Sequence, residues 1–397
     1  MKILFYLLFA TLPFTHITIL GHIHIYEIVL LPLVFFLPII IMKDVYSSKF
    51  LFLDIAVFLY FLDSIISVVV DWSDLYLAAR NFRALVLSPT LLYLVIRLSF
   101  LDLKDIRRAL FFLIPGILIQ SAIFIYQYLL HGLRPRGIEN VSSSTITLSF
   151  LFCVGILILF YFKGNIRSDR SYIIKVMAAI VLMAALLLSF TRMVIAGFIL
   201  IFPLSKIIWS KYKYRNYVSS FVIIGMIVIL GLISIFPNNG NHIYVKDEKQ
   251  IQKSYKRLLH LELYFLDINE RFTLWSTIAK KALKNSILGS GLSSYQIKQS
   301  NNAKNSLGSS HNVLISALVV GGIPGILILF LLILGTYNSF KLLPNNFELK
   351  GQLGNVLFVS FTILLLVGLT NDFSGGRIYL FFLIIALSAR LVIISEG

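Results

Sequence analysis

One histidine at the start of a long apolar run has the features of a general base. His311 follows Ser309 and Ser310 and stands directly before the run 312–336. We expect one of the two serines to cap a helix there, so that His311 lies in its first turn. The positive end of a helix disfavours imidazolium, and a neutral imidazole is the form that accepts a proton. The simpler interpretation, a polar residue at a membrane boundary, stays open.

Arginines beside apolar runs are the second group of candidates. Arg192 lies in a minimal turn between two runs, and Arg271 opens an expected helix in the longest loop. A planar guanidinium binds two phosphate oxygens at once, so these side chains could hold a diphosphate. Arg136 could instead be a solvated loop charge, and Arg377 could extend to lipid headgroups. Three further arginines are ambiguous: Arg80, Arg83 and Arg134.

Glycines follow the histidine at regular intervals. Gly322 lies eleven residues after His311, which is about three helical turns, so the two residues should share one face of a helix. Gly321 and Gly325 form a G-x-x-x-G pair, which permits close approach of a second helix. Packing alone would also explain these glycines.

The composition indicates that membrane helices position these residues. Hydrophobic residues make up 58% of the 397 residues, charged residues make up 13%, and the mean hydropathy is +0.89. The apolar runs are continuous rather than alternating, which favours spanning helices over a barrel. The net charge of +17 does not indicate a nucleic-acid partner, because lysine and arginine lie in short loops between the runs. We expect an all-α polytopic membrane protein surrounded by membrane lipids.

Twelve apolar runs predict about twelve transmembrane helices in a single membrane domain over residues 1–397. We place them at 3–20, 25–42, 51–70, 76–96, 109–130, 144–162, 172–190, 193–209, 217–236, 312–336, 354–370 and 377–395. No small-residue cleavage site follows the first run, so we expect it to be retained. Basic residues such as Arg97, Lys213 and Lys350 fall in alternate loops. This pattern predicts cytoplasmic termini.

The same rule places the long loop 237–311 outside the cytoplasmic membrane, which in a bacterium with two membranes is the periplasm. Its residues 250–266 have the pattern of an amphipathic helix at the membrane surface. Asp267 and Glu270 form a capping-box pattern that starts a second helix, from Arg271 to about Lys284. Trp275 should anchor that helix in the membrane interface.

Three motifs, in this order, resemble those of the O-antigen ligase and polymerase family. Ser189-Phe190-Thr191-Arg192 is similar to the family's S-x-[ST]-R turn. The stretch from Arg271-x3-Trp275 to Gly289-x-Gly291 is similar to its R-x3-W…P-L-x-G-x-G pattern, although Ser286-Ile287 stands where proline and leucine are common. The stretch from His311-Asn312 to Gly322-x-x-Gly325 resembles the H-[NSQ]-x9-G-x-x-[GTY] motif of O-antigen ligases.

The resemblance implies a metal-independent, cofactor-free glycosyltransferase of the GT-C type in the bacterial inner membrane. Such enzymes take a glycan from undecaprenyl diphosphate on the periplasmic side. Ligases move it onto lipid A-core in lipopolysaccharide biosynthesis, and polymerases join it to another lipid-linked repeat unit. By this resemblance, His311 takes the proton from the acceptor. Four arginines would hold the donor diphosphate: Arg192, Arg271, Arg136 and Arg377.

Three functions are compatible with the sequence. The ligase is our first hypothesis, because its motif fits at every defined position, and the polymerase is the alternative of the same fold. A secondary transporter is the alternative from another class, and it would need ionisable residues near the middle of a span. The sequence offers Asp54, Asp63 and His16 for that purpose, which are too few to favour transport.

Overall fold

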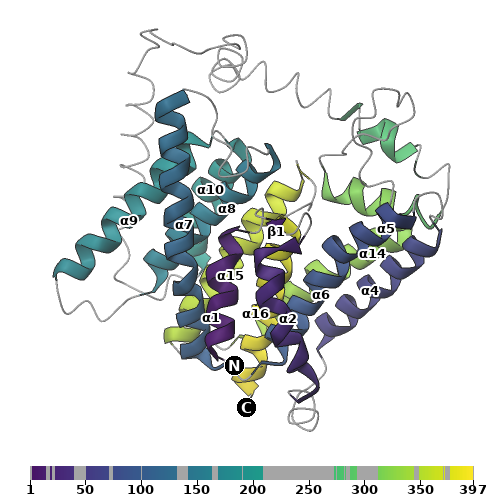
Figure 1. Cartoon of the computed structure of the whole chain (residues 1–397), viewed down its shortest axis with the longest axis horizontal. Coiled ribbons are helices and arrows are strands. Elements are labelled where there is room, and N and C mark those ends of the chain that lie inside the picture. Colours follow the sequence, from purple (N-terminus) through teal and green to yellow (C-terminus); the bar gives the residue numbers. More distant parts are fainter. Residues whose placement is uncertain are drawn as a thin grey trace. The chain divides into compact units, whose positions relative to one another are not determined.

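The structure is a computed structural model, and helices dominate the part of the chain that it describes (Figure 1). The described residues are 2–14, 18–19, 23–39, 51–70, 75–99, 101–131, 142–162, 169–189, 191–208, 272–273, 275–280, 282, 287–292, 312–343, 348–369, 371 and 376–396. The chain divides into two compact units. The first unit comprises 1–26, 104–264 and 355–364, and the second comprises 27–103, 265–354 and 365–397.

The first unit is built on α1, α7, α8, α9 and α10. The bounds are α1 (Lys2–Thr11), the 3-10 helix η1 (Leu12–Phe14), β1 (Thr18–Ile19), β2 (Ile23–His24), α7 (Leu103–His131), α8 (Ser142–Tyr161), α9 (Asp169–Leu188) and α10 (Arg192–Ile208). The helix α1 ends well before residue 20, the expected end of the first span. Pro13 explains the early end, because proline has no N–H and clashes with the preceding helical turn. The antiparallel pair β1–β2 follows.

Close packing around α8 forms the core of this unit. The rings of Phe124 and Phe152 meet edge to face, with their centroids 5.5 Å apart. Gly155 lets α9 approach, because a Cβ built on it would lie 2.9 Å from Cδ1 of Leu182. Cys153, the one cysteine of the sequence, is buried here as a free thiol, as expected for a residue inside an apolar run.

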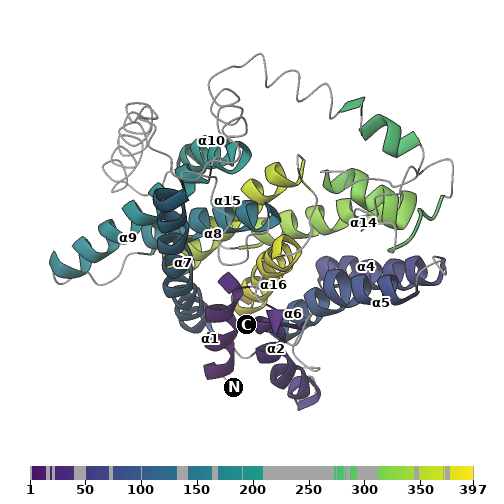
Figure 2. The ribbon, with the colours of Figure 1, turned by 45° about the horizontal axis from the view of Figure 1, so that its top comes forward.

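The second unit contains α4 and α14 side by side (Figure 2), and α16 packs against both α6 and α14. The bounds are α2 (Ile25–Phe35), α4 (Phe52–Val70), α5 (Leu75–Phe82), the π-helix η3 (Arg83–Leu87), α6 (Ser88–Arg97), α14 (Val313–Lys341) and α16 (Gly376–Glu396). The elements α5, η3 and α6 follow without interruption and together match the expected span 76–96. The helix α15 (Glu348–Gly368) has residues in both units.

Five of the described helices are long and apolar enough to cross a membrane. They are Phe52–Val69, Leu103–Leu130, Val313–Lys341, Gly351–Gly368 and Gly376–Ser395. Shorter apolar helices accompany them, among them Ile25–Phe35 and Thr145–Tyr161. A helical membrane protein is therefore supported. The number of twelve spans and the GT-C type stay predictions, and the expected span 217–236 lies outside the described residues.

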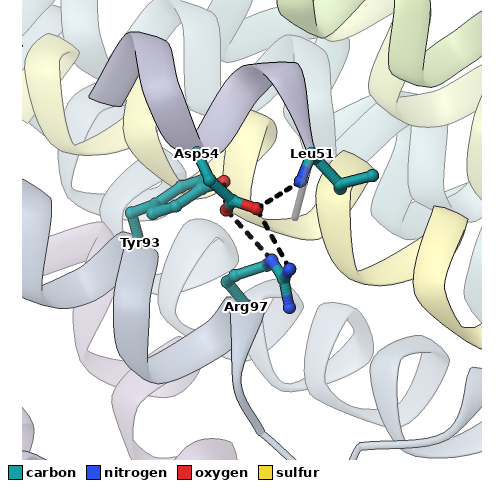
Figure 3. A network of polar contacts seen from close by, with 4 residues as sticks. All are labelled: Leu51, Asp54, Tyr93 and Arg97. Atoms are coloured by element: carbon teal, nitrogen blue, oxygen red, sulfur yellow. Dashed lines mark hydrogen bonds and ion pairs between the residues drawn. The ribbon is translucent and has the colours of Figure 1, made fainter. Parts of the chain in front are cut away.

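An ion pair between buried Arg97 and partly buried Asp54 joins the start of α4 to the end of α6 (Figure 3). The Nε of Arg97 donates to Oδ1 of Asp54 at 3.0 Å, and its Nη2 donates to Oδ2 at 3.0 Å. The Tyr93 hydroxyl donates to the same group at 2.6 Å, and the Leu51 amide donates at 2.8 Å. Arg97 is only 3% exposed and is the last residue of α6, so its expected place in a loop is wrong. A carboxylate 43 positions earlier in the chain provides its charge partner.

Replacing Arg97 with alanine should lower the free energy of unfolding by up to about 3 kcal/mol, because the partly buried Asp54 carboxylate would lose its charge partner. The midpoint of thermal unfolding in detergent measures this loss. The matched control is Arg108→Ala, since Arg108 is exposed and should change the stability by about 0.5 kcal/mol or less. Equal shifts for the two variants would contradict the structural role of Arg97.

Candidate functional site

The helix α14 is broken at the second glycine of its Gly321-Gly322 pair. Gly322 has φ 65° and ψ −147°, a backbone conformation that residues other than glycine rarely adopt. The break divides α14 into a first segment, Val313–Gly321, and a second segment, Ile323–Lys341. Regular helical geometry ends at this break. Because His311 lies outside the described residues, the helical face that it was expected to share with Gly322 stays a prediction.

The loop Ile287–Leu292 supplies the hydrogen bonds that the break removes. In a regular helix, the Ile323 amide would donate to the Val319 carbonyl. Here it donates to the Ile287 carbonyl at 3.0 Å, and the Ser290 amide donates to the Val319 carbonyl at 2.7 Å. Pro324 has no N–H for the Val320 carbonyl, which instead accepts from the Gly291 amide at 3.2 Å. Such a broken backbone is tolerated within a membrane only where other protein groups bond to it.

This exchange requires the motif glycines, and we call Gly289, Gly291 and Gly322 together the glycine interlock. Gly289 and Gly291 have φ values of 83° and 81°, in the left-handed region that favours glycine. A Cβ on Gly289 would lie 2.6 Å from the Gly322 nitrogen, and a Cβ on Gly322 would overlap the Ile287 carbonyl oxygen. Two motifs that are separate in the sequence therefore meet here backbone to backbone.

Asn312 begins α14 as its N-cap. Its Oδ1 accepts from the amides of Leu314 at 2.8 Å and Ile315 at 3.3 Å, while its Nδ2 donates to the Leu369 carbonyl at 2.9 Å. The expected cap by Ser309 or Ser310 is wrong, since the helix begins only at Val313. His311 itself lies outside the described residues. It precedes the N-cap by one position in the sequence, and its expected neutral form stays a prediction.

The motif helix around Trp275 packs against the first segment of α14. Residues 272–273, 275–280 and 282 are helical, in agreement with the expected helix from Arg271 to about Lys284. Ile278 and Ala282 form a buried cluster with Leu318 and Val319 of α14. The rings of Phe272 and Trp275 meet edge to face at 5.3 Å. Arg271 lies outside the described residues, directly before Phe272.

Asn81, which lies on α5, is hydrogen-bonded to the end of the loop Ile287–Leu292. Its Nδ2 donates to the Leu292 carbonyl at 2.8 Å, and the residue is 2% exposed. Asn81 was not among the residues predicted from the sequence, although an asparagine inside an apolar run was a visible signal. It connects α5 to the end of the R-x3-W…G-x-G stretch.

Arg377 lies in the first turn of α16 and is 3% exposed. Extension to lipid headgroups would require an exposed side chain, so this alternative is wrong. The neighbouring Tyr379 hydroxyl donates to the Ala84 carbonyl at 2.5 Å, at the start of the π-helix that begins with Arg83. Arg80 is exposed and Arg83 is partly buried. Binding of a diphosphate by Arg377 stays a prediction.

The turn before Arg192 is built by the other residues of its motif. The Ser189 hydroxyl accepts from the Thr191 amide at 3.2 Å, and the Thr191 hydroxyl lies 2.9 Å from that of Ser149. The Thr191 carbonyl accepts the first amides of α10, from Val194 and Ile195, each at 3.1 Å. Arg192 begins α10, although the structure does not describe its side chain. Arg136 lies outside the described residues.

Residues 176–330 match the O-antigen ligase family. This segment of the chain is similar to the O-antigen ligase family. The match runs from α9 into the second segment of α14, and so contains the turn before Arg192, the Trp275 helix and the glycine interlock. No curated protein matches the chain.

The family match confirms the resemblance for this segment, without separating ligases from polymerases. Members of the O-antigen ligase family act on lipid-linked glycans in O-antigen processing. As for metals, the described residues contain no group of three or more His, Cys, Asp or Glu side chains arranged to hold an ion.

Proposed function

We propose that this protein is an O-antigen ligase of the bacterial inner membrane, which moves a glycan from undecaprenyl diphosphate onto lipid A-core in lipopolysaccharide biosynthesis. The glycine interlock is the observation that supports this most strongly. It joins the stretch that follows Arg271 to the helix that follows His311, so that two motifs with proposed chemical roles are held together by three backbone hydrogen bonds. The ligase form of the His311 motif, complete at each defined position, favours the ligase.

The proposed reaction is a displacement at the anomeric carbon of the donor. The acceptor hydroxyl forms the new bond to this carbon, the bond to the diphosphate oxygen breaks, and the diphosphate leaves on its undecaprenyl carrier. His311 takes the hydroxyl proton. Arg192 and Arg271, with Arg136 and Arg377 as further candidates, offset the negative charge on the leaving diphosphate. Fixed guanidinium groups can supply the charge that a metal ion would otherwise provide, so we propose a metal-independent and cofactor-free enzyme.

The proposed orientation places the site on the periplasmic side and both termini in the cytoplasm. The distribution of basic residues among the loops supports it. The candidate alternatives are a polymerase, which would use a lipid-linked repeat unit as acceptor, and a secondary transporter. The ion pair between Asp54 and Arg97 gives Asp54 a structural role, which leaves fewer ionisable residues for transport than the sequence offered.

Deleting the gene should separate the two glycosyltransferases. Loss of a ligase leaves polymerised glycan on the lipid carrier and bare core on lipopolysaccharide. Electrophoresis of lipopolysaccharide, together with analysis of the lipid-linked glycans, measures both products. Restoring the gene on a plasmid is the control. Core that carries a single repeat unit would contradict the ligase and support the polymerase.

A further inference from the structure

The helix α4 places a carboxylate at the break in α14. A Cβ built on Gly321 would overlap Oδ2 of Asp63, so the carboxylate fills the space that a side chain at position 321 would need. A Cβ on Gly325 would lie 3.6 Å from the same oxygen. Gly321 ends the first segment of α14, and Gly325 belongs to the first turn of the second segment. The Asp63 carboxylate therefore lies beside the backbone on both sides of the break.

A second polar side chain of α4 reaches the same place. The Ser67 hydroxyl lies one helical turn beyond Asp63 and is within hydrogen-bond distance of the Val320 carbonyl, at 3.2 Å. The Val320 carbonyl receives no hydrogen bond from residue 324, because Pro324 has no N–H. One face of α4 thus provides a carboxylate and a hydroxyl to the part of α14 where the regular hydrogen bonds are lost.

The charge of Asp63 suits this position. The second segment of α14 begins at Ile323, and the start of a helix attracts negative charge. Within the described part of the chain, the Asp63 carboxylate has no hydrogen-bond or ion-pair partner, whereas Asp54 on the same helix is paired with Arg97. A charge inside a span is costly to stability, and groups retained at such a cost are concentrated at functional sites.

We propose that Asp63 is a positioning residue for the transfer reaction. Its charge fixes the two segments of α14 relative to each other at the break. Through the first segment it determines the position of Asn312, the N-cap that directly follows His311 in the sequence. This inference rests on the proposed function, because its effect is measured in the transfer of glycan.

Two variants test the charge and the position separately. Asp63→Asn keeps the shape of the side chain and removes its charge, while Gly321→Ala keeps the charge and displaces the carboxylate. We expect each to lower kcat by about ten- to 100-fold, the range that a small displacement of a catalytic group produces. The KM for the donor should change little, because a misplaced base acts on the transition state rather than on binding. The assay uses purified protein, undecaprenyl-diphosphate-linked glycan and the acceptor that the wild type accepts.

The midpoint of thermal unfolding distinguishes a positioning role of Asp63 from a purely structural one. Asp63→Asn should leave the unfolding midpoint unchanged or raise it, because a neutral amide is less costly in the membrane than a carboxylate that has no partner among the described residues. The matched control is Asp54→Asn on the same helix. It should lower the midpoint by breaking the pair with Arg97, and leave the kcat of the folded protein unchanged.

A double variant tests the contact itself. Once Asp63→Ala has removed the obstructing oxygen, adding Gly321→Ala should cause no further loss of kcat, so the two effects should not add. Additive losses would show that Gly321 acts independently of Asp63.

The inference is overturned if Asp63→Asn lowers the midpoint while the folded protein keeps its kcat. It is also overturned if Asp63→Asn leaves both quantities unchanged. The variant His311→Ala, measured in the same assay, separates this failure from failure of the proposed function. Inactive His311→Ala beside fully active Asp63→Asn would remove only the role of Asp63, whereas fully active His311→Ala would contradict the proposed chemistry.

Discussion

Replacing His311 with alanine should lower the rate of glycan transfer by about 100- to 10,000-fold, the usual effect of losing a general base. The donor should still bind with nearly its normal affinity, because the proposed diphosphate ligands are arginines. Transfer of glycan from undecaprenyl diphosphate by purified protein measures the rate, and retention of labelled donor measures binding. Arg271→Lys should weaken binding as well as turnover, since an ammonium group cannot form the paired contacts of a guanidinium.

A histidine outside the motif is the matched control for this experiment. His131 ends α7, and His131→Ala should transfer glycan at the normal rate. Both variants must first reach the membrane in normal amounts, because a misfolded membrane protein also loses activity. Near-normal transfer by well-expressed His311→Ala would make His311 a packing residue, and another base would then have to be sought, first at Glu139, Glu270 and Asp372.

Replacing Gly322 with alanine should prevent the protein from reaching its folded state in normal amounts. The backbone conformation alone costs about 1–3 kcal/mol for a residue with a side chain. The new Cβ would also overlap the Ile287 carbonyl oxygen and displace the loop that completes the hydrogen bonds of α14. The amount of monodisperse protein in detergent and its midpoint of thermal unfolding measure the effect.

Gly351 provides the same substitution without the obstruction. It lies in α15, and no atom is found within 4 Å of a Cβ built on it. Alanine is about 1 kcal/mol more favourable than glycine inside a helix, so Gly351→Ala should be neutral or stabilising. If Gly322→Ala behaved like this control, the glycine interlock would not be a rigid element of the fold.

Much of the helical architecture was predictable from the apolar runs, because a spanning helix satisfies its backbone locally. The break in α14 was not, since its missing hydrogen bonds are completed by the backbone of a loop about thirty residues earlier. The glycines were visible in the sequence, but their spacing suggested a helical face or helix packing. Backbone-to-backbone contacts between distant segments leave no trace in a hydrophobic pattern.

The individual polar residues were predicted less well than the helices. Asn312 is as good a cap as the serines before it, and only the start of the helix decides between them. Arg97 was expected in a loop because the rule for basic residues concerns averages over loops, and it does not detect a partner such as Asp54. Asp63 was visible as an ionisable residue inside a span. Its contact with Gly321 depends on how α4 packs against α14, which the sequence pattern does not determine.

The glycine interlock also has a consequence for genetics. At Gly322 the obstructing atoms are the Ile287 carbonyl and the Gly289 amide, which every amino acid at those positions would carry. No second substitution can remove them, so a screen for intragenic suppressors of Gly322→Ala should return true revertants. Gly155 differs, because its nearest neighbour is the Leu182 side chain. A smaller residue at position 182 can make room for a larger one at position 155, so compensating substitutions are possible at this pair. At the glycine interlock they are not.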